Sequence, residues 1–186
     1  MNKNKIVFTF ATAEVNFIGQ IFIKITELLT GKLKLKKLYD EYLSENRPPE
    51  LFWDDAVDKL NFTLITNFQE GSYIPKKGKL IVIANHAFGV ADGVSICSAI
   101  SKVRQDYKMV THKVLRQAEA VKDKILPIDF NENREALITN INTRKEAEKV
   151  LHNEGVLVLF PSGTIATKQN LKKNTKAHDG EWKQWV

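Results

Sequence analysis

The chain has 186 residues, of which 43% are hydrophobic, so it can bury one sizeable core but is too short for two full domains. Its single cysteine, Cys97, excludes an intramolecular disulfide and a cysteine-based zinc cluster. We therefore expect an intracellular protein. The formal net charge of +6 is modest, and the lysines responsible for it gather in clusters.

The N-terminal residues 1–13 imitate a secretory signal, but their unbroken apolar run covers only residues 6–10, and we expect no cleavage. Residues 10–29 instead carry apolar side chains at helical spacing, which predicts an amphipathic helix that is too polar to span a bilayer. Its phenylalanines suit either packing in a domain core or insertion into a membrane interface. The helix is followed directly by the lysines at 32, 34, 36 and 37.

Clustered lysines favour an anionic partner, either phospholipid or nucleic acid, although a solvated face is an equally good reading of each cluster alone. A second cluster comprises Lys172, Lys173 and Lys176. No nucleic-acid-binding motif accompanies the charge, and no aromatic residues alternate with the basic ones at a spacing that suggests base stacking. We expect the partner of these lysines to be an anionic membrane surface and not a nucleic acid.

Beyond the break "NRPPE" at 46–50, residues 51–60 predict a short helix, and the pattern then changes. Apolar runs at 62–68, 79–85, 107–113, 125–130 and 155–160 predict strands. Residues 93–103 and 134–153 predict helices, the second capped by Asn131 or Asn133 and followed by Gly155. This alternation predicts an α/β fold with a largely parallel sheet and helices on its faces.

Polar residues follow three of these predicted strands, where α/β folds bind ligands. After the first, His86 and Asp92 lie in a turn with Gly89 and Gly93, whose flexibility would let the pair meet. A neutral imidazole can take a proton from a hydroxyl while a carboxylate steadies the imidazolium, and the following helix would aim N–H groups at an oxyanion. A structural histidine bonded to a nearby aspartate is the alternative.

The other two strand ends offer groups for a polar head group. Ser162, Gly163 and Thr164 supply hydroxyls and amides suited to phosphate, and Arg134 could clamp a phosphate or carboxylate. An ordinary turn and a surface arginine are the alternatives. Cys97 lies in an apolar helix and is expected in the core, not as a nucleophile. We expect structural or exposed roles for the remaining histidines, which are His112, His152 and His178.

The segments "NHAFGVADG", "LPIDFNENREAL" and "FPSGT", in this order, resemble the glycerophospholipid acyltransferase family. With the lead-in "LTGKLKLKKLYDEY" they are most similar to its haemolysin-like bacterial branch, which includes lyso-ornithine-lipid acyltransferases. The resemblance runs from about Leu28 to Trp185. It implies a glycerolipid acyltransferase-like fold and transfer of a fatty acyl group from acyl-CoA or acyl carrier protein to the hydroxyl of a lysolipid, with the thioester as co-substrate and no metal or further cofactor.

The resemblance also assigns roles to residues. It implies that His86 is the general base and that Asp92 completes the dyad. The implied substrate-binding residues are Asn85, Gly89, Gly93, Arg134, Phe160, Pro161, Ser162, Gly163 and Thr164. Residues 1–60 are then a membrane-associating helical region and 61–186 the α/β domain, peripheral to the cytoplasmic face of the inner membrane. A non-catalytic membrane-binding relative or fragment is the alternative.

Two features depart from the family pattern. Five residues separate His86 from Asp92, whereas the usual spacing has four, and Ser162 stands where the family usually has a glutamate that faces the acceptor. Family members also continue with further strands and a proline-containing motif, so we expect this chain to lack the C-terminal part of the domain.

Overall fold

The computed structural model describes residues 32–65 and 74–163. The predicted helix at 10–29, the second lysine cluster and Thr164 lie outside the described residues. Within the described ranges, four strands form one sheet: β1 (Leu80–Ile83), β2 (Tyr107–His112), β3 (Ile125–Ile128) and β4 (Val156–Leu159). They are ordered β1-β4-β2-β3, and every pairing is parallel, which confirms the predicted α/β fold.

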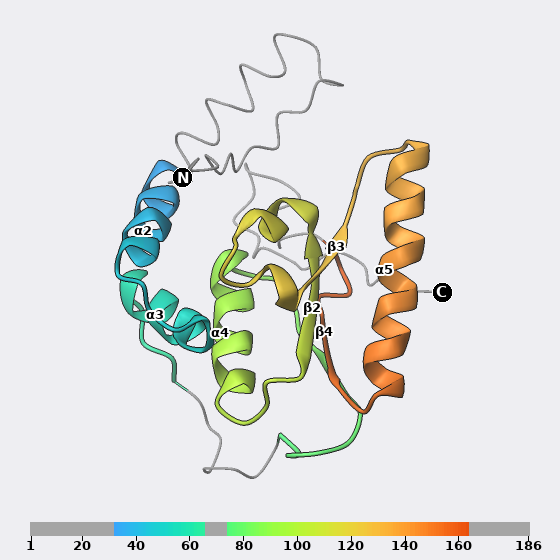
Figure 1. Cartoon of the computed structure of the whole chain (residues 1–186), viewed down its shortest axis with the longest axis horizontal. Coiled ribbons are helices and arrows are strands. Elements are labelled where there is room, and N and C mark those ends of the chain that lie inside the picture. Colours follow the sequence, from blue (N-terminus) through green and yellow to red (C-terminus); the bar gives the residue numbers. More distant parts are fainter. Residues whose placement is uncertain (1–31, 66–73, 164–186) are drawn as a thin grey trace, which may run out of the picture.

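Two long helices cover opposite faces of this sheet (Figure 1). The chain moves from β1 through α4 (Val90–Ser101) to β2 and β3, and then α5 (Arg134–His152) carries it back to β4 in the interior of the sheet. Because crossovers between parallel strands are right-handed, reversing the direction of travel places the second helix on the other face. All four strands therefore end at the same edge, where the predicted site residues follow.

The position of β4 inside the sheet explains why its sequence is continuously apolar. Val156 and Val158 are fully buried against α4, whereas Leu157 packs on the α5 side of the sheet. A parallel strand covered on both faces needs apolar residues at every position. The edge strand β1 is covered less completely, and its Ile81 and Ile83 remain about half exposed.

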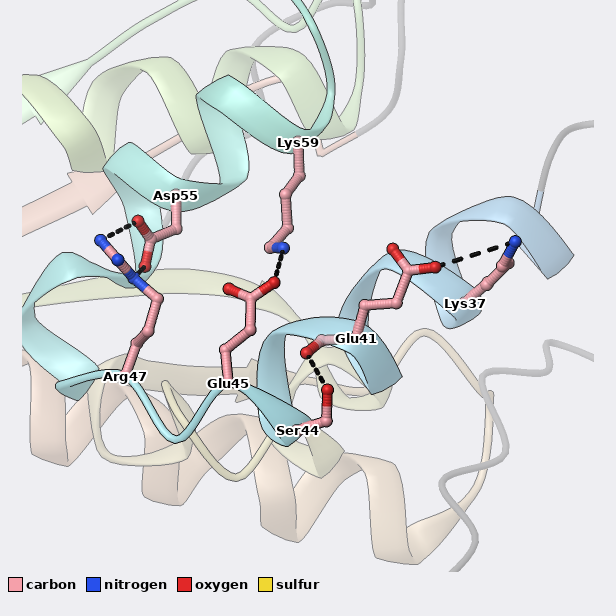
Figure 2. Close-up of polar contacts among 7 residues, drawn as sticks. All are labelled: Lys37, Glu41, Ser44, Glu45, Arg47, Asp55 and Lys59. Atoms are coloured by element: carbon pink, nitrogen blue, oxygen red, sulfur yellow. Dashed lines mark hydrogen bonds and ion pairs between the residues drawn. The ribbon is translucent and has the colours of Figure 1, made fainter.

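Two further helices, α2 (Lys32–Ser44) and α3 (Phe52–Lys59), pack beside α4 through Tyr39, Tyr42 and Trp53, which share its core. Figure 2 shows how the break between them is fixed: the Arg47 guanidinium donates two 2.7 Å bonds to the Asp55 carboxylate, and Lys59 Nζ lies 2.6 Å from Glu45. The Asp55 hydrogen bonds raise the pKa of Arg47. The predicted break at 46–50 and the short helix after it are thus confirmed.

Lysines of the first cluster lie on α2, and those whose side chains are described face acidic partners one turn away. Lys36 Nζ is 2.5 Å from Asp40, and Lys37 Nζ is 3.8 Å from Glu41 (Figure 2 shows the second pair). The positive charge of this cluster is therefore partly compensated within the helix itself. No helix within 32–65 or 74–163 is both long and apolar enough to cross a membrane.

The structure corrects one predicted strand and decides between two predicted caps. Residues 62–65 alternate between half-buried and exposed side chains but pair with no strand. The alternation arises because side chains such as Phe62 pack on the core from an irregular segment. The rest of that predicted strand, 66–68, lies outside the described residues. Asn133 is the cap of α5, since its side chain accepts the Ala136 N–H at 2.8 Å.

A buried arginine joins the opposite, amino-terminal ends of the strands. Arg104 has a side chain only 3% exposed and forms a bidentate ion pair with Asp106. It also donates to the carbonyl oxygens of Gly78 before β1, at 2.5 Å, and Glu154 before β4, at 2.6 Å. One guanidinium thus ties together the segments that lead into β1, β2 and β4.

Candidate active site

The turn after β1 brings the predicted histidine and aspartate together. His86 Nδ1 lies 3.2 Å from Asp92 Oδ2, and both side chains are mostly buried, with 21% and 18% of their surface exposed. With Nδ1 facing the carboxylate, Nε2 is the ring nitrogen left to exchange a proton with a substrate. The longer spacing between the two residues therefore still allows the pair to form.

Asp92 is held by the start of the helix on which it lies. It occupies the first turn of α4, and its Oδ2 accepts the backbone N–H of Phe88 at 2.8 Å. A carboxylate is stabilised at this position because the N–H groups and dipole of a helix N-terminus favour negative charge. The same oxygen therefore faces His86 and caps the turn, which fixes its position.

Gly89 makes the turn possible. It is buried and has φ +63°, in the left-handed region that favours glycine, immediately before Val90 begins α4. Gly93 is different, because it lies within α4 in helical conformation, and a Cβ there would make ordinary contact with Met109 Sδ at 3.7 Å. The chain reversal between His86 and Asp92 thus depends on Gly89 and not on Gly93.

The ring of His86 packs on the strand end next to it. Its centroid lies 4.4 Å from that of Phe160, with the two planes tilted by 30°. Phe160 directly follows β4, the neighbour of β1 in the sheet, and is itself buried. This contact and Asp92 restrain the imidazole from two directions.

The other predicted binding residues occupy different surroundings. Pro161 and Ser162 are buried, Ser162 with only 1% exposure, and Gly163 completes the turn with φ +65°. Asn85 is exposed just after β1. Arg134 is exposed at the first position of α5, which packs on β3 at the far edge of the sheet from His86.

A second aromatic pair at the same sheet edge was not predicted. His112, the last residue of β2, stacks on Phe130 after β3 with a centroid distance of 5.6 Å, and its Nδ1 accepts the Val114 N–H. Burial lowers the pKa of His112, and Lys113 opposes protonation further while Asp129 favours it. Phe130 also reaches the turn after β4, since a Cβ on Gly163 would lie 3.8 Å from its ring. The sequence feature that could have predicted this pair is that His112 and Phe130 lie at the ends of consecutive predicted strands.

Asp129 is a second residue that the sequence reasoning missed. It is buried, which by itself favours the neutral acid, but its pKa is nevertheless lowered because Lys113 Nζ lies 2.6 Å away and Asn131 donates its N–H. The side chain of Asn140 bonds to both the N–H and the carbonyl oxygen of Asp129. These contacts fasten the end of β3 to α5.

Cys97 is fully buried in α4, and burial raises the pKa of its thiol to about 12, so the expected core role is confirmed. Within the described ranges, no group of three or more His, Cys, Asp or Glu side chains is arranged to hold a metal ion. The dyad is the cluster of residues in this part of the chain whose geometry suits proton transfer to a substrate hydroxyl.

A family model for acyltransferases matches residues 65–180, which is more than half of the chain. No curated protein and no solved structure matches this chain. The matched region contains the sheet, both covering helices and the His86–Asp92 pair. The chain therefore belongs to the acyltransferase family and is an enzyme that transfers acyl groups.

Proposed function

We propose that this enzyme transfers a fatty acyl group from a thioester, of coenzyme A or acyl carrier protein, to the hydroxyl of a lysolipid at a membrane surface. The observation that carries the proposal is the 3.2 Å approach of His86 Nδ1 to Asp92 Oδ2 at the carboxyl edge of the sheet. The family match supports acyl transfer. The resemblance to lyso-ornithine-lipid acyltransferases supports a lysolipid acceptor.

In the proposed step, His86 Nε2 takes the proton of the lysolipid hydroxyl as its oxygen attacks the thioester carbonyl. Asp92 steadies the imidazolium that forms, because its carboxylate faces the other ring nitrogen. The tetrahedral intermediate then collapses, so that a C–O bond has formed and the C–S bond breaks. The proton on His86 passes to the departing thiolate, which leaves as the free thiol.

A shallow, mostly open groove lies along α4 and offers apolar surface to an acyl chain. It has a volume of about 330 Å³ and is lined by the irregular segment 62–65 and by Ser95, Ile96 and Ala99. On a helix, residues three, four and seven positions after Asp92 share its face, so the groove begins one turn beyond the dyad. We propose that the apolar tail lies there while its thioester carbonyl reaches His86.

The membrane part of the proposal starts from the sequence. We propose that the amphipathic pattern of residues 10–29, with the lysines at 32–37, binds the cytoplasmic face of the inner membrane without crossing it. Each lysine near an anionic surface contributes about 1 kcal/mol of attraction. Flotation with anionic and neutral vesicles tests this: equal binding to both would remove the electrostatic contribution.

The proposed reaction is tested with labelled acyl-CoA and acyl carrier protein thioesters, each offered lyso-ornithine lipid and lysophosphatidic acid. A matched acceptor in which the free hydroxyl is methylated serves as the control. We expect an acylated product with the free hydroxyl and none with the methyl ether. Thioester cleavage at the same rate with either acceptor would show hydrolysis and contradict the proposal.

A further inference from the structure

The outward face of α5 carries an exposed apolar patch at the end of the helix that is nearest to the carboxyl edge of the sheet. In Figure 1, α5 is the outermost element on its side of the sheet, with one face on the sheet and the other directed outward. On the side that faces the sheet, Ala136, Thr143 and Ala147 are buried, and Leu151 packs against the core. Leu137, Ile138 and Ile141, by contrast, are 60%, 49% and 45% exposed.

The apolar patch belongs to a face that also carries cations. Residues three, four, seven, ten and eleven positions after Arg134 share one side of the helix, and they are Leu137, Ile138, Ile141, Arg144 and Lys145. All six side chains are exposed. The three cations therefore flank the three apolar side chains on one continuous strip, which we call the α5 strip.

Acidic residues of α5 lie mainly on its other exposed side. Glu135 and Glu146 are off the strip, and Glu146 pairs with Lys149 at 2.6 Å. One carboxylate, Glu148, lies on the strip itself, four positions after Arg144, and is 3.4 Å from it. The strip thus keeps a net positive charge beside exposed apolar surface, a combination that suits an anionic lipid surface better than it suits water.

The strip also lies close to the catalytic end of the molecule. Phe130, which is 51% exposed, joins β3 to the loop before α5. The strands β1 and β3 are three strand spacings apart, or about 14 Å, and α5 begins at the carboxyl ends of the strands, where His86 also lies. A surface that touches the start of α5 is therefore near His86. The strip is thus a second basic surface, separate from the lysines of α2, and it also exposes apolar side chains.

We propose that the α5 strip docks the enzyme on an anionic bilayer, with Leu137, Ile138 and Ile141 entering the interface and Arg134, Arg144 and Lys145 facing the head groups. This extends the proposed function by a membrane-contacting surface separate from residues 10–29. Its test needs no turnover, so its failure and the failure of the proposed transferase reaction can be distinguished.

The experiment measures binding of the full chain to vesicles of phosphatidylcholine alone and of phosphatidylcholine with phosphatidylglycerol, at a lipid concentration that half-binds the parent. The apolar variant is Leu137→Gln/Ile138→Gln/Ile141→Gln, and its control, Leu43→Gln/Leu51→Gln, removes exposed apolar residues elsewhere. The charge variant is Arg144→Gln/Lys145→Gln. Its control, Lys77→Gln/Lys102→Gln, removes two exposed cations off the strip.

We expect the apolar variant to bind anionic vesicles at least about tenfold more weakly than the parent. The charge variant should lose about fivefold to thirtyfold, since a cation near an anionic surface contributes about fivefold, and should change little on neutral vesicles. Both controls should bind within about twofold of the parent.

Two results would overturn the proposal. Either the strip variants bind as the parent does, or the parent is a dimer by light scattering that the apolar variant dissociates without a change in vesicle binding. The second result would make the strip an interface between copies. Circular dichroism of every variant confirms that binding is compared between folded proteins.

Discussion

Replacing Arg104 with methionine should destabilise the protein more than any surface substitution, although Arg104 is remote from the dyad. Its side chain is 3% exposed and bonds to Asp106 and to the carbonyl oxygens of Gly78 and Glu154. Charged hydrogen bonds contribute about 1.5–3 kcal/mol each, and they are not additive when they share one group. Asp106 is half exposed and can be hydrated, so the loss comes mainly from the hydrogen bonds to the two carbonyl oxygens, and we expect about 3–5 kcal/mol in total.

Urea unfolding followed by circular dichroism measures this loss, and thermal unfolding should show a Tm lower by about 6–20 °C for a chain of this size. Arg144→Met is the matched control, since its ion pair with Glu148 is half exposed and should cost less than about 1 kcal/mol. A loss below about 1 kcal/mol for Arg104→Met would refute the reasoning.

The same variant should change the response to acid. Arg104 holds the pKa of Asp106 below its usual value by hydrogen bonding to the carboxylate. A lowered pKa stabilises the folded state fully above the unfolded value, about 3.9, and this stabilisation disappears as the pH falls through the folded value. The parent should therefore lose this contribution below about pH 4, and Arg104→Met should not have it to lose.

Three further substitutions test other parts of the account. Burial lowers the pKa of His112, so below about pH 6.5 the unfolded chain binds more protons than the folded one, and the stability of the parent should fall as the pH is lowered. His112→Gln should therefore flatten the dependence of the urea midpoint on pH between about 5 and 8. Equal slopes would contradict this. Ala99→Phe should fill the α4 groove and lower kcat/KM at least about tenfold for palmitoyl but not octanoyl thioesters; an equal loss for both would remove the groove from acyl-chain binding. Asp55→Asn should lower the urea midpoint, because Arg47 loses its bidentate carboxylate, and an unchanged midpoint would show that the pair is dispensable.

The strands were predictable where both faces are buried or where alternation is strong. The run "VLVL" of β4 had to be a central strand, because a helix of its length would be unusually short and every position is apolar. The segment 62–65 alternates between half-buried and exposed side chains but forms no strand, since alternation reports which side chains are buried and not what the backbone pairs with.

The dyad was predictable because its two members are close in sequence, and one turn with Gly89 at φ +63° brings them together. The contacts that complete the site were not, because they join residues far apart along the chain. Phe160 reaches His86 only because β4 returns to pair with β1, and Phe130 reaches His112 only because β2 and β3 are neighbours. Arg104 was missed for the same reason: its carbonyl partners lie 26 and 50 residues away.

The division between residues 1–60 and 61–186 stays a prediction, as do the thioester donor, the acceptor and the membrane location. Within the described residues, α2 and α3 share one core with α4 and the sheet. Any functional boundary near residue 60 would therefore fall within a continuously packed structure.

The central claim is that His86, oriented by Asp92, is the general base, and the direct measurement is the acyl-transfer rate per folded molecule for the parent, His86→Ala and Asp92→Asn. Asparagine can still accept the Phe88 N–H but cannot stabilise an imidazolium, so this variant removes the charge and keeps the turn. We predict that His86→Ala loses about 100- to 10,000-fold in rate and that Asp92→Asn is also slower, with both variants folded. An active parent whose His86→Ala variant keeps its full rate per folded molecule would contradict the account.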